Sequence, residues 1–465
     1  MASPVTELTD EQAACIDAIL RKRSVFVTGQ AGTGKSRLVG MLKELYPSCP
    51  VLAPSGLAAL NVGGETIHRF MGGGLLNTKR MSDLVNDVRR RRAWIADLEI
   101  LIIDEIGMVH PMLLWKLSLF LTLIRHRMGV PSAHEPFGGV QMIFFGDFMQ
   151  LSPVSKPYEV MHDQNYRCWL QFNKMDNLDS LAYCFQDRTW KDLDPEVHVL
   201  TRQFRQGGDL AFAQMLGRLR VNQLTAADHH LLRSRVARPG DVENVLHLFP
   251  TNGQADDKNA QHLVAQDKST QRTFTGRWKF KKLVHKHVPV PTGKLLASTL
   301  AACRKSSHVK EVIHLRTGCF VMHLINSDPL VNGSRGEVIG WEQTADGETC
   351  PLVKWDTGAD SVVLPVTIDR AFGNAILSIR QVPLTLSAAI TIHKAQGMSL
   401  QEAAISTRSF ATSQTYVAIS RLRSLSGLHL LDYHPAKIAI DTRTAEFDAK
   451  LRATGSRKRR HSEIQ

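Results

Sequence analysis

The sequence predicts an α/β fold with two tandem domains built on parallel sheets and a small β-barrel inserted into the second. Three observations predict it. Continuous apolar runs of strand length recur in both halves, helical stretches separate them, and turn-rich β segments interrupt the second series. Apolar runs without alternation are typical of parallel strands covered on both faces. A chain of 465 residues is also too long for one compact core.

The strand-length runs fall into two series. Those of the first 200 residues are SVFVT (24–28), PVLA (50–53), EILII (99–103) and VQMIFF (140–145). Those of the second are VHVL (197–200), VLHLF (245–249), LTLSAAI (384–390), AAIS (403–406) and LHLL (428–431). We therefore expect a first domain at 1–192 and a second at 193–330 and 384–440, with helices between the strands.

Turn signals crowd residues 331–383. They are Asn332-Gly333, Arg335-Gly336, Asp346-Gly347 and Thr357-Gly358. Such spacing between β-rich runs predicts a small antiparallel barrel inserted into the second domain. The last eleven residues, GSRKRRHSEIQ, lack apolar periodicity. We therefore predict a basic flexible tail at 441–465.

Composition narrows the class of protein. A hydrophobic content of 43% is that of a globular chain, and the net charge of +13 suits a polyanionic partner, although solubility alone also accounts for it. The seven cysteines are scattered and form no Cys-x-x-Cys pair, which argues against a zinc ribbon or a disulfide framework. No apolar run approaches the roughly 20 residues of a membrane helix. The acidic, polar N-terminus resembles neither a signal peptide nor a mitochondrial presequence, so we expect a soluble intracellular protein.

A phosphate-binding loop follows the first predicted strand. Its pattern is G-x-x-x-x-G-K-S, formed by Gly29, Gln30, Ala31, Gly32, Thr33, Gly34, Lys35 and Ser36. Glycines let backbone N–H groups turn around phosphate oxygens, and the N-terminus of the following helix adds positive charge. Lys35 is expected on the β- and γ-phosphates and Ser36 on Mg²⁺. The strand–loop–helix setting makes a chance match improbable.

A carboxylate pair ends the strand LEILII. Asp104 and Glu105 are expected at the carboxyl edge of the sheet, where open α/β sheets bind ligands. Asp104 would hold Mg²⁺ through water, and Glu105 would act as the general base for the attacking water. Without the upstream loop, an acidic pair that caps the next helix would explain them equally well.

Three further residues distinguish a motor from other nucleotide-binding proteins. Gln150 follows the strand VQMIFF in GDFMQLSPV, and we expect it near the γ-phosphate. Arg205 in LTRQFRQ and Arg421 in TYVAISRLRSLSGL would reach that phosphate from the second domain as arginine fingers. Taken alone, an arginine on a helix face is more often simply solvated.

The ordered motifs resemble those of the PIF (petite integration frequency) DNA helicases. They are APSGLAALNVGGETIHRFMG, LIIDEIGM, GDFMQLSPV, LTRQFRQ, LVNGSRGEVIG, PLTLSAAITIHKAQGMSL and YVAISRLRSLSGL. The resemblance runs from residue 8 to about 431. It implies two RecA-like domains, ATP with Mg²⁺, five-prime-to-three-prime movement on single-stranded DNA, and unwinding of duplex, fork or G-quadruplex DNA in replication, recombination, repair or telomere maintenance. Gly107 and Ser152 depart from the family's usual Ser and Pro, which bears on subfamily more than on activity.

The resemblance also assigns binding residues. Single-stranded DNA contacts are expected from Ser55, Asn61, Thr66, His68, Phe70, Thr391, His393 and Lys394. The hydroxyls and basic groups would contact phosphate and sugar, and Phe70 would stack on a base. Gln396 and Gly397 would lie between the bound DNA strand and the nucleotide and link the two binding sites. Gln12 would read adenine, while Thr9 and Gln12 also form a helix capping box.

Other basic segments have two interpretations each. Residues 71–92 are a candidate wedge for parting duplex junctions, although the run at 89–92 is equally that of a solvated helix face. RWKFKKLVHKH (277–287) mixes basic and aromatic residues and is a candidate duplex contact. RKRR (457–460) is either a nuclear import signal or a merely soluble tail. We expect the protein to act as a monomer in the nucleus. The alternatives to a DNA helicase are an RNA helicase, a protein-stripping translocase and a regulatory ATPase switch.

Overall fold

The computed structural model divides the chain into two compact units. Unit 1 comprises 1–236, 399–401 and 407–465, and unit 2 comprises 237–398 and 402–406. The structure describes residues 8–72, 80–88, 93–153, 160–161, 163–176, 182–283, 292–306, 309–325, 327, 330, 333–372, 375–408 and 411–462. No helix within these ranges is long and apolar enough to cross a membrane.

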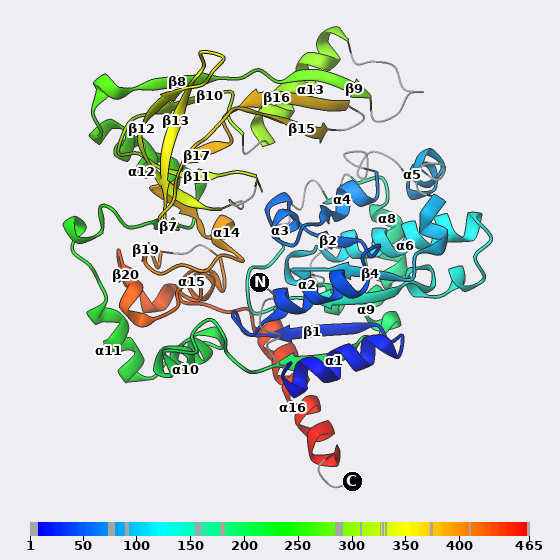
Figure 1. Ribbon diagram of the computed structural model, residues 1–465. Coiled ribbons are helices and arrows are strands. Elements are labelled where there is room, and N and C mark those ends of the chain that lie inside the picture. Colours follow the sequence, from blue (N-terminus) through cyan, green and yellow to red (C-terminus); the bar gives the residue numbers. More distant parts are fainter. Residues whose placement is uncertain are drawn as a thin grey trace. The chain divides into compact units, whose positions relative to one another are not determined.

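Unit 1 is built on a six-stranded parallel sheet with the order β3-β2-β4-β5-β1-β6 (Figure 1). Its strands are β1 (Val25–Gly29), β2 (Val51–Ala53), β3 (Glu65–Thr66), β4 (Ile100–Ile103), β5 (Gln141–Phe145) and β6 (Glu196–Leu200). The apolar runs predicted near residues 24, 50, 99 and 140 thus form parallel strands, as the sequence indicated.

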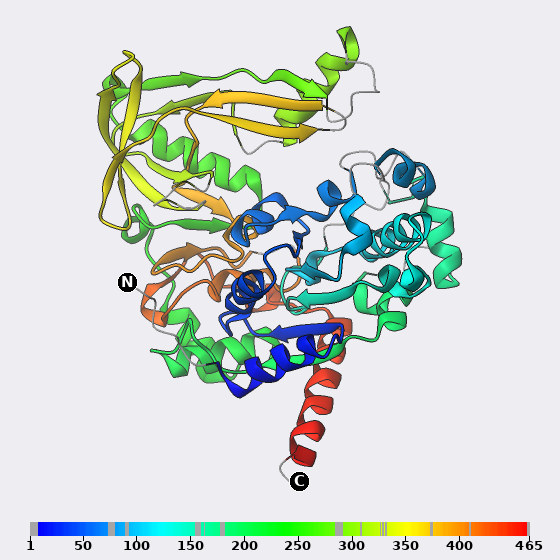
Figure 2. The same ribbon diagram turned by 45° about the vertical axis from the view of Figure 1, so that its right-hand side comes forward.

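Helices of unit 1 lie on both faces of this sheet, as Figure 2 shows, and other helices of the unit lie beyond it. They are α1 (Asp10–Leu20), α2 (Lys35–Leu45), α3 (Gly56–Asn61), α4 (Ile67–Phe70), α5 (Met81–Val88), α6 (Pro111–Arg127), α8 (Tyr166–Asn173), α9 (Arg188–Leu193), α10 (Leu210–Arg220), α11 (Ala226–Ser234), α15 (Gln414–Ile419) and α16 (Thr442–Ser462). The short strand β20 (Leu428–Leu430) also belongs to this unit.

Alternate residues of each central strand enter different cores. Phe26 packs in one apolar cluster, whereas Val25 and Val27 pack in another. The same alternation separates Phe144 from Ile143. Because successive strand side chains point to opposite faces, an uninterrupted apolar run is required where both faces are covered. This explains why the strands lack a polar–apolar alternation.

Unit 2 contains parallel strands together with antiparallel sheets. Its parallel strands, β7 (His247–Phe249), β18 (Ala389–Thr391) and β19 (Ala403–Ile405), lie in the order β18-β7-β19. Its helices are α12 (Asn252–Ala265), α13 (Gly293–Ser306) and α14 (Ile392–Ala395). The run 384–390 is divided between two sheets, because β17 (Leu384–Leu386) pairs with β11 (Phe320–His323) and only β18 joins the parallel strands.

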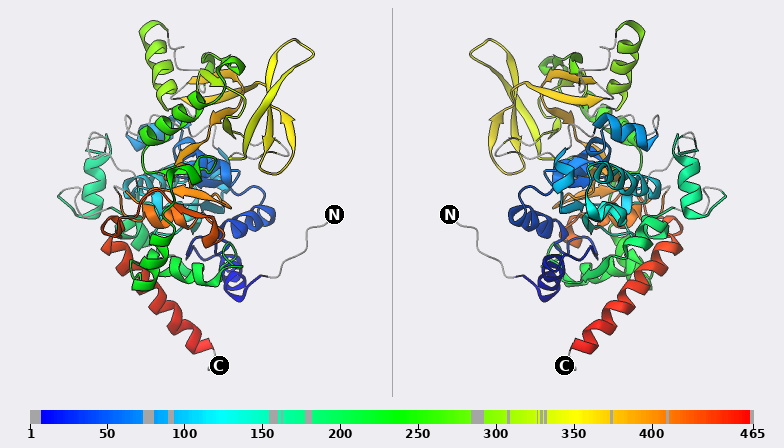
Figure 3. Two further views of the ribbon diagram at one scale, coloured as in Figure 1. Left: turned by 90° about the vertical axis from the view of Figure 1, so that its left-hand side faces the viewer. Right: turned by 90° about the vertical axis from the view of Figure 1, so that its right-hand side faces the viewer.

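The remaining strands of unit 2 form three antiparallel groups. A five-stranded sheet has the order β14-β13-β12-β11-β17, with β12 (Arg335–Gln343), β13 (Thr349–Trp355) and β14 (Asp360–Val362). The pair β12–β13 forms the long yellow ribbon in Figure 3. Strands β15 (Val366–Phe372), β16 (Ala375–Gln381) and β9 (Lys279–Leu283) form a second group, and β8 (Arg272–Thr275) pairs with β10 (Val312–Leu315).

Three sequence-based boundaries differ from the structure. Residues 197–200, expected in the second domain, pair with β1 and complete the first sheet, and Arg205 and Arg421, expected there too, lie in unit 1. The barrel expected at 331–383 is not confirmed, because β14 and β17 stand at opposite ends of the strand order in the described chain and the β15–β16 hairpin pairs with β9 instead. The tail expected from 441 is the helix α16, whose Phe447 and Leu451 pack against the unit 1 core.

Two candidate contact segments lie partly outside the described residues. Within the wedge candidate 71–92, residues 73–79 and 89–92 are not described, while α5 buries Met81, Leu84 and Val85 in the core of unit 1. Within 277–287, strand β9 is described and residues 284–287 are not. Neither segment's contact with DNA is tested, so both stay predictions.

Candidate nucleotide site and nucleic-acid interface

Three adjacent strands bring the site together. In the order β4-β5-β1, each strand ends directly before one of the predicted functional segments. Asp104 follows β4, Asp147 and Gln150 follow β5, and the phosphate loop follows β1. Because the strands are parallel, their carboxyl ends lie along one edge of the sheet. Segments more than 100 residues apart therefore meet there.

The phosphate loop has the backbone that its glycines allow. Gly32 and Gly34 have φ angles of 86° and 89°, in the left-handed region that favours glycine. The Lys35 ammonium donates to the carbonyls of Gly29 (2.7 Å) and Gln30 (3.0 Å), and Thr33 Oγ1 donates to the Gln30 carbonyl at 2.9 Å. Burial lowers the pKa of Lys35, although the carboxylates of Asp147, Glu105 and Asp104 oppose that shift.

The acidic pair after β4 is desolvated and locally strained. Burial, followed by the charge of Glu105, raises the pKa of Asp104 to about 7. One carboxylate oxygen of Asp104 accepts the Glu105 N–H at 2.9 Å. Glu105 has a φ of 53° and a ψ of 44°, a left-handed backbone uncommon for a residue with a Cβ. Such conformations gather at functional sites, where the surrounding fold holds them in place.

Gln150 and Arg421 approach each other beside these carboxylates. The Arg421 guanidinium lies 3.5 Å from Gln150 Oε1, and its Nε donates to the Val417 carbonyl at 2.8 Å. Arg421 is 2% exposed. Burial lowers its pKa, while Glu105 is the first of the groups that raise it. The structure thus brings together the sensor glutamine and one of the two predicted arginine fingers.

Arg205 lies next to the phosphate loop and to Arg421. Its Nε donates to Ser399 Oγ at 2.8 Å and its guanidinium to the Ser420 carbonyl at 3.0 Å. A Cβ placed on Gly32 would lie 2.7 Å from Arg205 Cβ. Burial, followed by repulsion from Arg421, lowers the pKa of Arg205 to about 9. Two partly desolvated arginines side by side form an environment that favours an anion.

Gln12 both caps α1 and faces the loop. Its Oε1 accepts the Thr9 N–H at 3.2 Å, which confirms the predicted capping box. Gln12 Nε2 is buried without a hydrogen-bond partner among the described residues. That nitrogen lies 2.9 Å from the point where a Cβ on Gly34 would stand. A buried donor left without a partner beside a phosphate loop is typical of a ligand contact.

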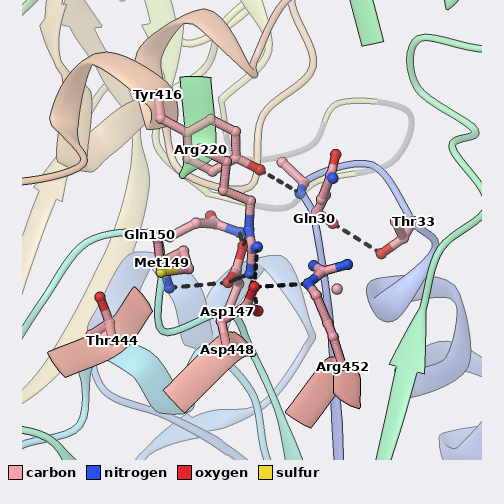
Figure 4. A network of polar contacts seen from close by, with 12 residues as sticks. Gln30, Thr33, Asp147, Met149, Gln150, Arg220, Tyr416, Thr444, Asp448 and Arg452 are labelled. Atoms are coloured by element: carbon pink, nitrogen blue, oxygen red, sulfur yellow. Dashed lines mark hydrogen bonds and ion pairs between the residues drawn. The ribbon is translucent and has the colours of Figure 1, made fainter. Parts of the chain in front are cut away.

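Sequence reasoning missed three residues around the loop. Tyr416 Oη accepts the Ala31 N–H at 3.0 Å, and Phe204 donates its N–H to the Gly32 carbonyl at 2.9 Å. Arg220, the last residue of α10, binds Asp147 through two hydrogen bonds (Figure 4). Tyr416 stood inside a recognised motif but had no assigned role. Nothing in the local sequence distinguishes Arg220 from a solvated helix arginine.

The predicted DNA residues of unit 1 follow the ends of β2 and β3. Ser55 Oγ accepts the Ala58 N–H at 3.2 Å, and Thr66 Oγ1 accepts the Arg69 N–H at 3.2 Å, so each begins a short helix. Asn61 and His68 are exposed. These side chains can contact phosphate or sugar.

The prediction that Phe70 stacks on a base is wrong. Its ring is fully buried and makes edge contacts with Phe120 and Trp94. In α4 the residue lies on the side of the helix that faces the core, three positions after the equally buried Ile67. Phe70 is therefore a core aromatic.

Unit 2 repeats the local arrangement of Thr66. The segment 391–394 reads Thr-Ile-His-Lys, as 66–69 reads Thr-Ile-His-Arg. Thr391 Oγ1 accepts the Lys394 N–H at 3.3 Å at the start of α14, and Ile392 is buried like Ile67. Burial lowers the pKa of both His393 and Lys394. Each unit thus presents a helix-capping threonine, then a buried isoleucine and two basic residues.

Gln396 and Gly397 complete this segment. Gln396 is 7% exposed, and both polar atoms of its side chain are buried without a hydrogen-bond partner among the described residues. Gly397 has a φ of 84°. Buried, unsatisfied amide groups favour a ligand contact. The partner of Gln396, whether nucleotide or DNA, stays a prediction.

The loop and the acidic pair at one edge of the parallel sheet, with two arginines beside them, define a P-loop protein built to hold a nucleoside triphosphate. A family model described as PIF1-like helicase matches residues 7–176. The chain is 30% identical to ATP-dependent DNA helicase Pif1 of Bdellovibrio bacteriovorus, covering 95% of this chain and 91% of that protein. The chain belongs to the PIF1-like helicase family.

Further similar proteins also belong to this family. The chain is 34% identical to human ATP-dependent DNA helicase PIF1, covering 97% of this chain and 65% of the human protein. It thus spans about two thirds of that relative's length. The crystal structure of Candida albicans Pif1 helicase matches with a TM-score of 0.77 and 28% identity, covering 96% of this chain and all of that one. The crystal structure of Bacteroides Pif1 bound to single-stranded DNA matches with a TM-score of 0.67 and 28% identity, covering 97% of this chain and 98% of that one.

Proposed function

We propose that the protein is an ATP-hydrolysing DNA helicase that moves five-prime to three-prime on single-stranded DNA. The observation that carries the proposal is the meeting of Arg205 and Arg421 beside the phosphate loop and the acidic pair. An arginine that reaches a transferring phosphoryl group stabilises its charge. The direction of movement rests on the family alone.

The chain's own groups divide the work of hydrolysis. The loop N–H groups and the start of α2 bind the phosphates, and the Lys35 ammonium neutralises the β and γ oxygens. Glu105 accepts a proton from the attacking water. Gln150 lies between Asp147 and Arg421, so it is placed to report on the γ-phosphate. Arg205 and Arg421 stabilise the charge that develops on the transferred group.

Mg²⁺ fits the residues present. Ser36 supplies a hydroxyl at the start of α2, and the carboxylate of Asp104 is buried beside that of Glu105. Mg²⁺ usually takes one or two protein oxygens and completes its shell with phosphate and water. The ion would neutralise the phosphates and relieve repulsion between the two carboxylates. A complete cage of protein ligands is not required.

The adenine base would be read by Gln12. Its unsatisfied Nε2 beside Gly34 supplies a donor, while Oε1 is occupied by the cap. One adenine acceptor facing that nitrogen would satisfy it. Because the same side chain caps α1, base recognition and the position of the first helix are joined in one residue.

DNA would be held through its backbone by the two Thr-Ile-His segments. Both threonines accept a backbone N–H and keep a hydroxyl hydrogen for a phosphate oxygen, and basic residues follow each one. A similar Pif1 from Bacteroides was crystallised bound to single-stranded DNA, which supports single-stranded DNA as the ligand. Contacts of this kind do not read bases, so we expect weak sequence preference and strong salt dependence.

Single-stranded DNA should stimulate ATP hydrolysis by the wild-type chain, and Lys35→Ala should abolish it. Steady-state hydrolysis is measured with matched DNA and RNA oligonucleotides. Stronger stimulation by RNA would replace the DNA assignment with an RNA helicase. Hydrolysis indifferent to either polymer would indicate a regulatory ATPase switch. Nuclear location and a monomeric state stay predictions.

A further inference from the structure

A buried ion network joins the C-terminal helix to the loop that carries Gln150 (Figure 4). At its centre is Arg220, which is 1% exposed. Its guanidinium donates to both carboxylate oxygens of Asp147 at 2.7 and 3.1 Å, and to both oxygens of Asp448 at 2.7 and 2.8 Å. Arg452 donates to Asp448 at 2.8 Å. Two arginines and two aspartates thus balance in charge.

Asp147 uses its carboxylate to shape the sensor loop, residues 146–150. Oδ1 accepts the Met149 N–H at 3.0 Å, and Oδ2 lies 3.4 Å from the Gln150 side-chain nitrogen. Gly146 and Gly107 leave no space for a Cβ, because such an atom would lie 2.9 Å from the Ile106 nitrogen and the Asp147 carbonyl oxygen respectively. The loop is therefore packed tightly against the segment that follows Glu105.

Helix α16 contacts the same loop through an aromatic ring. Phe447 stacks on Phe185 with 4.0 Å between ring centroids and an angle of 4°. It also meets the edge of Phe148, the residue after Asp147, at 5.6 Å. Adjacent residues of α16 therefore support adjacent residues of the sensor loop, one by charge and one by packing.

Because the network balances two positive and two negative charges, the Asp448 carboxylate is needed to compensate the charge of Arg220. Burial alone would lower the pKa of Arg220, but the paired carboxylates of Asp147 and Asp448 raise it. Breaking a buried pair by removing one partner leaves an uncompensated charge, which costs more than the pair contributes. Without Asp448, one side of the Arg220 guanidinium loses its partner. The Arg220 guanidinium, which orients the Asp147 carboxylate, is then free to rotate.

We propose that Arg220 and Asp448 are positioning residues for ATP hydrolysis, holding Gln150 through Asp147, so that the C-terminal helix sets the hydrolytic rate. The inference rests on the proposed ATPase activity. It assigns α16, which lies beyond the recognised motifs, a role in the chemical step. Neither residue is expected to touch the nucleotide.

The test compares Asp448→Asn with Asp228→Asn. Asp228 forms a matched two-bond pair with Arg218, on the same helix α10 as Arg220, but has no contact with the sensor loop in the described structure. Both changes neutralise an aspartate paired with an arginine. ATP hydrolysis is measured at saturating single-stranded DNA, with nucleotide-binding stoichiometry and thermal unfolding measured on the same samples.

Asp448→Asn should lower kcat at least about tenfold while the KM for ATP changes less than about threefold, because a misplaced group acts mainly in the transition state. Asp228→Asn should keep kcat within about twofold. Its loss of Tm should be smaller, because Arg218 is partly exposed whereas Arg220 is buried. Arg220→Lys, which keeps the charge but loses the fork, should resemble Asp448→Asn. If Asp448→Asn does not fold, Phe447→Leu should give the same kcat loss to a smaller degree.

Equal kcat values in Asp448→Asn and wild type would overturn the positioning role, and so would an equal kcat loss in Asp228→Asn. If Phe447→Leu is the variant measured, wild-type kcat overturns it too. Absence of hydrolysis in the wild type would instead overturn the proposed function itself. The two failures are therefore distinguishable by the wild-type measurement.

Discussion

Substituting Gly32 by alanine tests whether the phosphate loop must keep its present backbone. Gly32 has a φ of 86°, and an added Cβ would lie 2.7 Å from Arg205 Cβ and 2.9 Å from Gln203 Oε1. The first of these contacts is with an atom fixed to the backbone, so rotation of a side chain cannot relieve it. Alanine should therefore drive the loop away from the nucleotide-binding conformation.

The size of the effect follows from that conformation. A left-handed backbone costs a residue with a Cβ roughly 1–2 kcal/mol. Nucleotide binding must restore the conformation, so affinity should fall by at least about 5- to 30-fold, since 1.4 kcal/mol corresponds to tenfold. The contact with Arg205 adds to this cost. Global stability should change little, because the loop can relax in the free protein.

Gly40→Ala is the matched control. Gly40 lies in α2, directly beyond the loop, and no atom would lie within 4 Å of an added Cβ. Alanine there should stabilise the helix by about 0.5–1 kcal/mol. Affinity is measured by titration with a fluorescent ATP analogue, and stability by thermal unfolding. Affinity in Gly32→Ala within about twofold of wild type would show that the loop does not need a glycine at this position.

Two further substitutions test the site, and a third tests the pH dependence of stability. Glu105→Gln should keep ATP affinity yet lower kcat by about 100-fold or more, since it removes only the general base; unchanged single-turnover hydrolysis would exclude that role. Arg421→Lys should lower kcat by about 1000-fold with little change in nucleotide binding, because lysine lacks the planar fork; a twofold loss would argue against a finger. Burial, then the charge of Lys116, lowers the pKa of His110 to about 4, and its Nδ1 accepts the Met112 N–H at the start of α6. The unfolded chain takes up that proton first, so the free energy of unfolding should fall by about 2 kcal/mol between pH 6.5 and 4; His110→Asn, measured by urea unfolding, should flatten this decline, and an equal decline would contradict it.

Local chemistry made the nucleotide site predictable. A glycine-rich loop, an acidic pair and a glutamine each follow an apolar strand, and parallel strands bring such residues to one edge. The surroundings of Arg205 could not be predicted, because its neighbours Ser399 and Ser420 lie about 200 residues away in sequence. Long-range pairing of this kind leaves no local signal.

The errors have physical causes. Phe70 was assigned to DNA because its motif suggested a base contact, but its position on α4 faces the core. The prediction that residues 197–200 belong to the second domain is wrong, because the apolar character of a strand does not indicate which sheet the strand joins. Helix α16 differs from the predicted tail because the last eleven residues, which lack apolar periodicity, do not represent the whole of 441–465. Phe447 and Leu451, four residues apart, carried the helical signal.

The central claim is that ATP hydrolysis in this chain drives movement along DNA in one direction. Its most direct test is ATP-dependent unwinding of two duplexes that differ only in carrying a five-prime or a three-prime single-stranded tail, with Lys35→Ala as the inactive control. The wild type alone should separate the five-prime-tailed duplex. Separation of only the three-prime-tailed duplex, or of neither while ATP is hydrolysed, would contradict it.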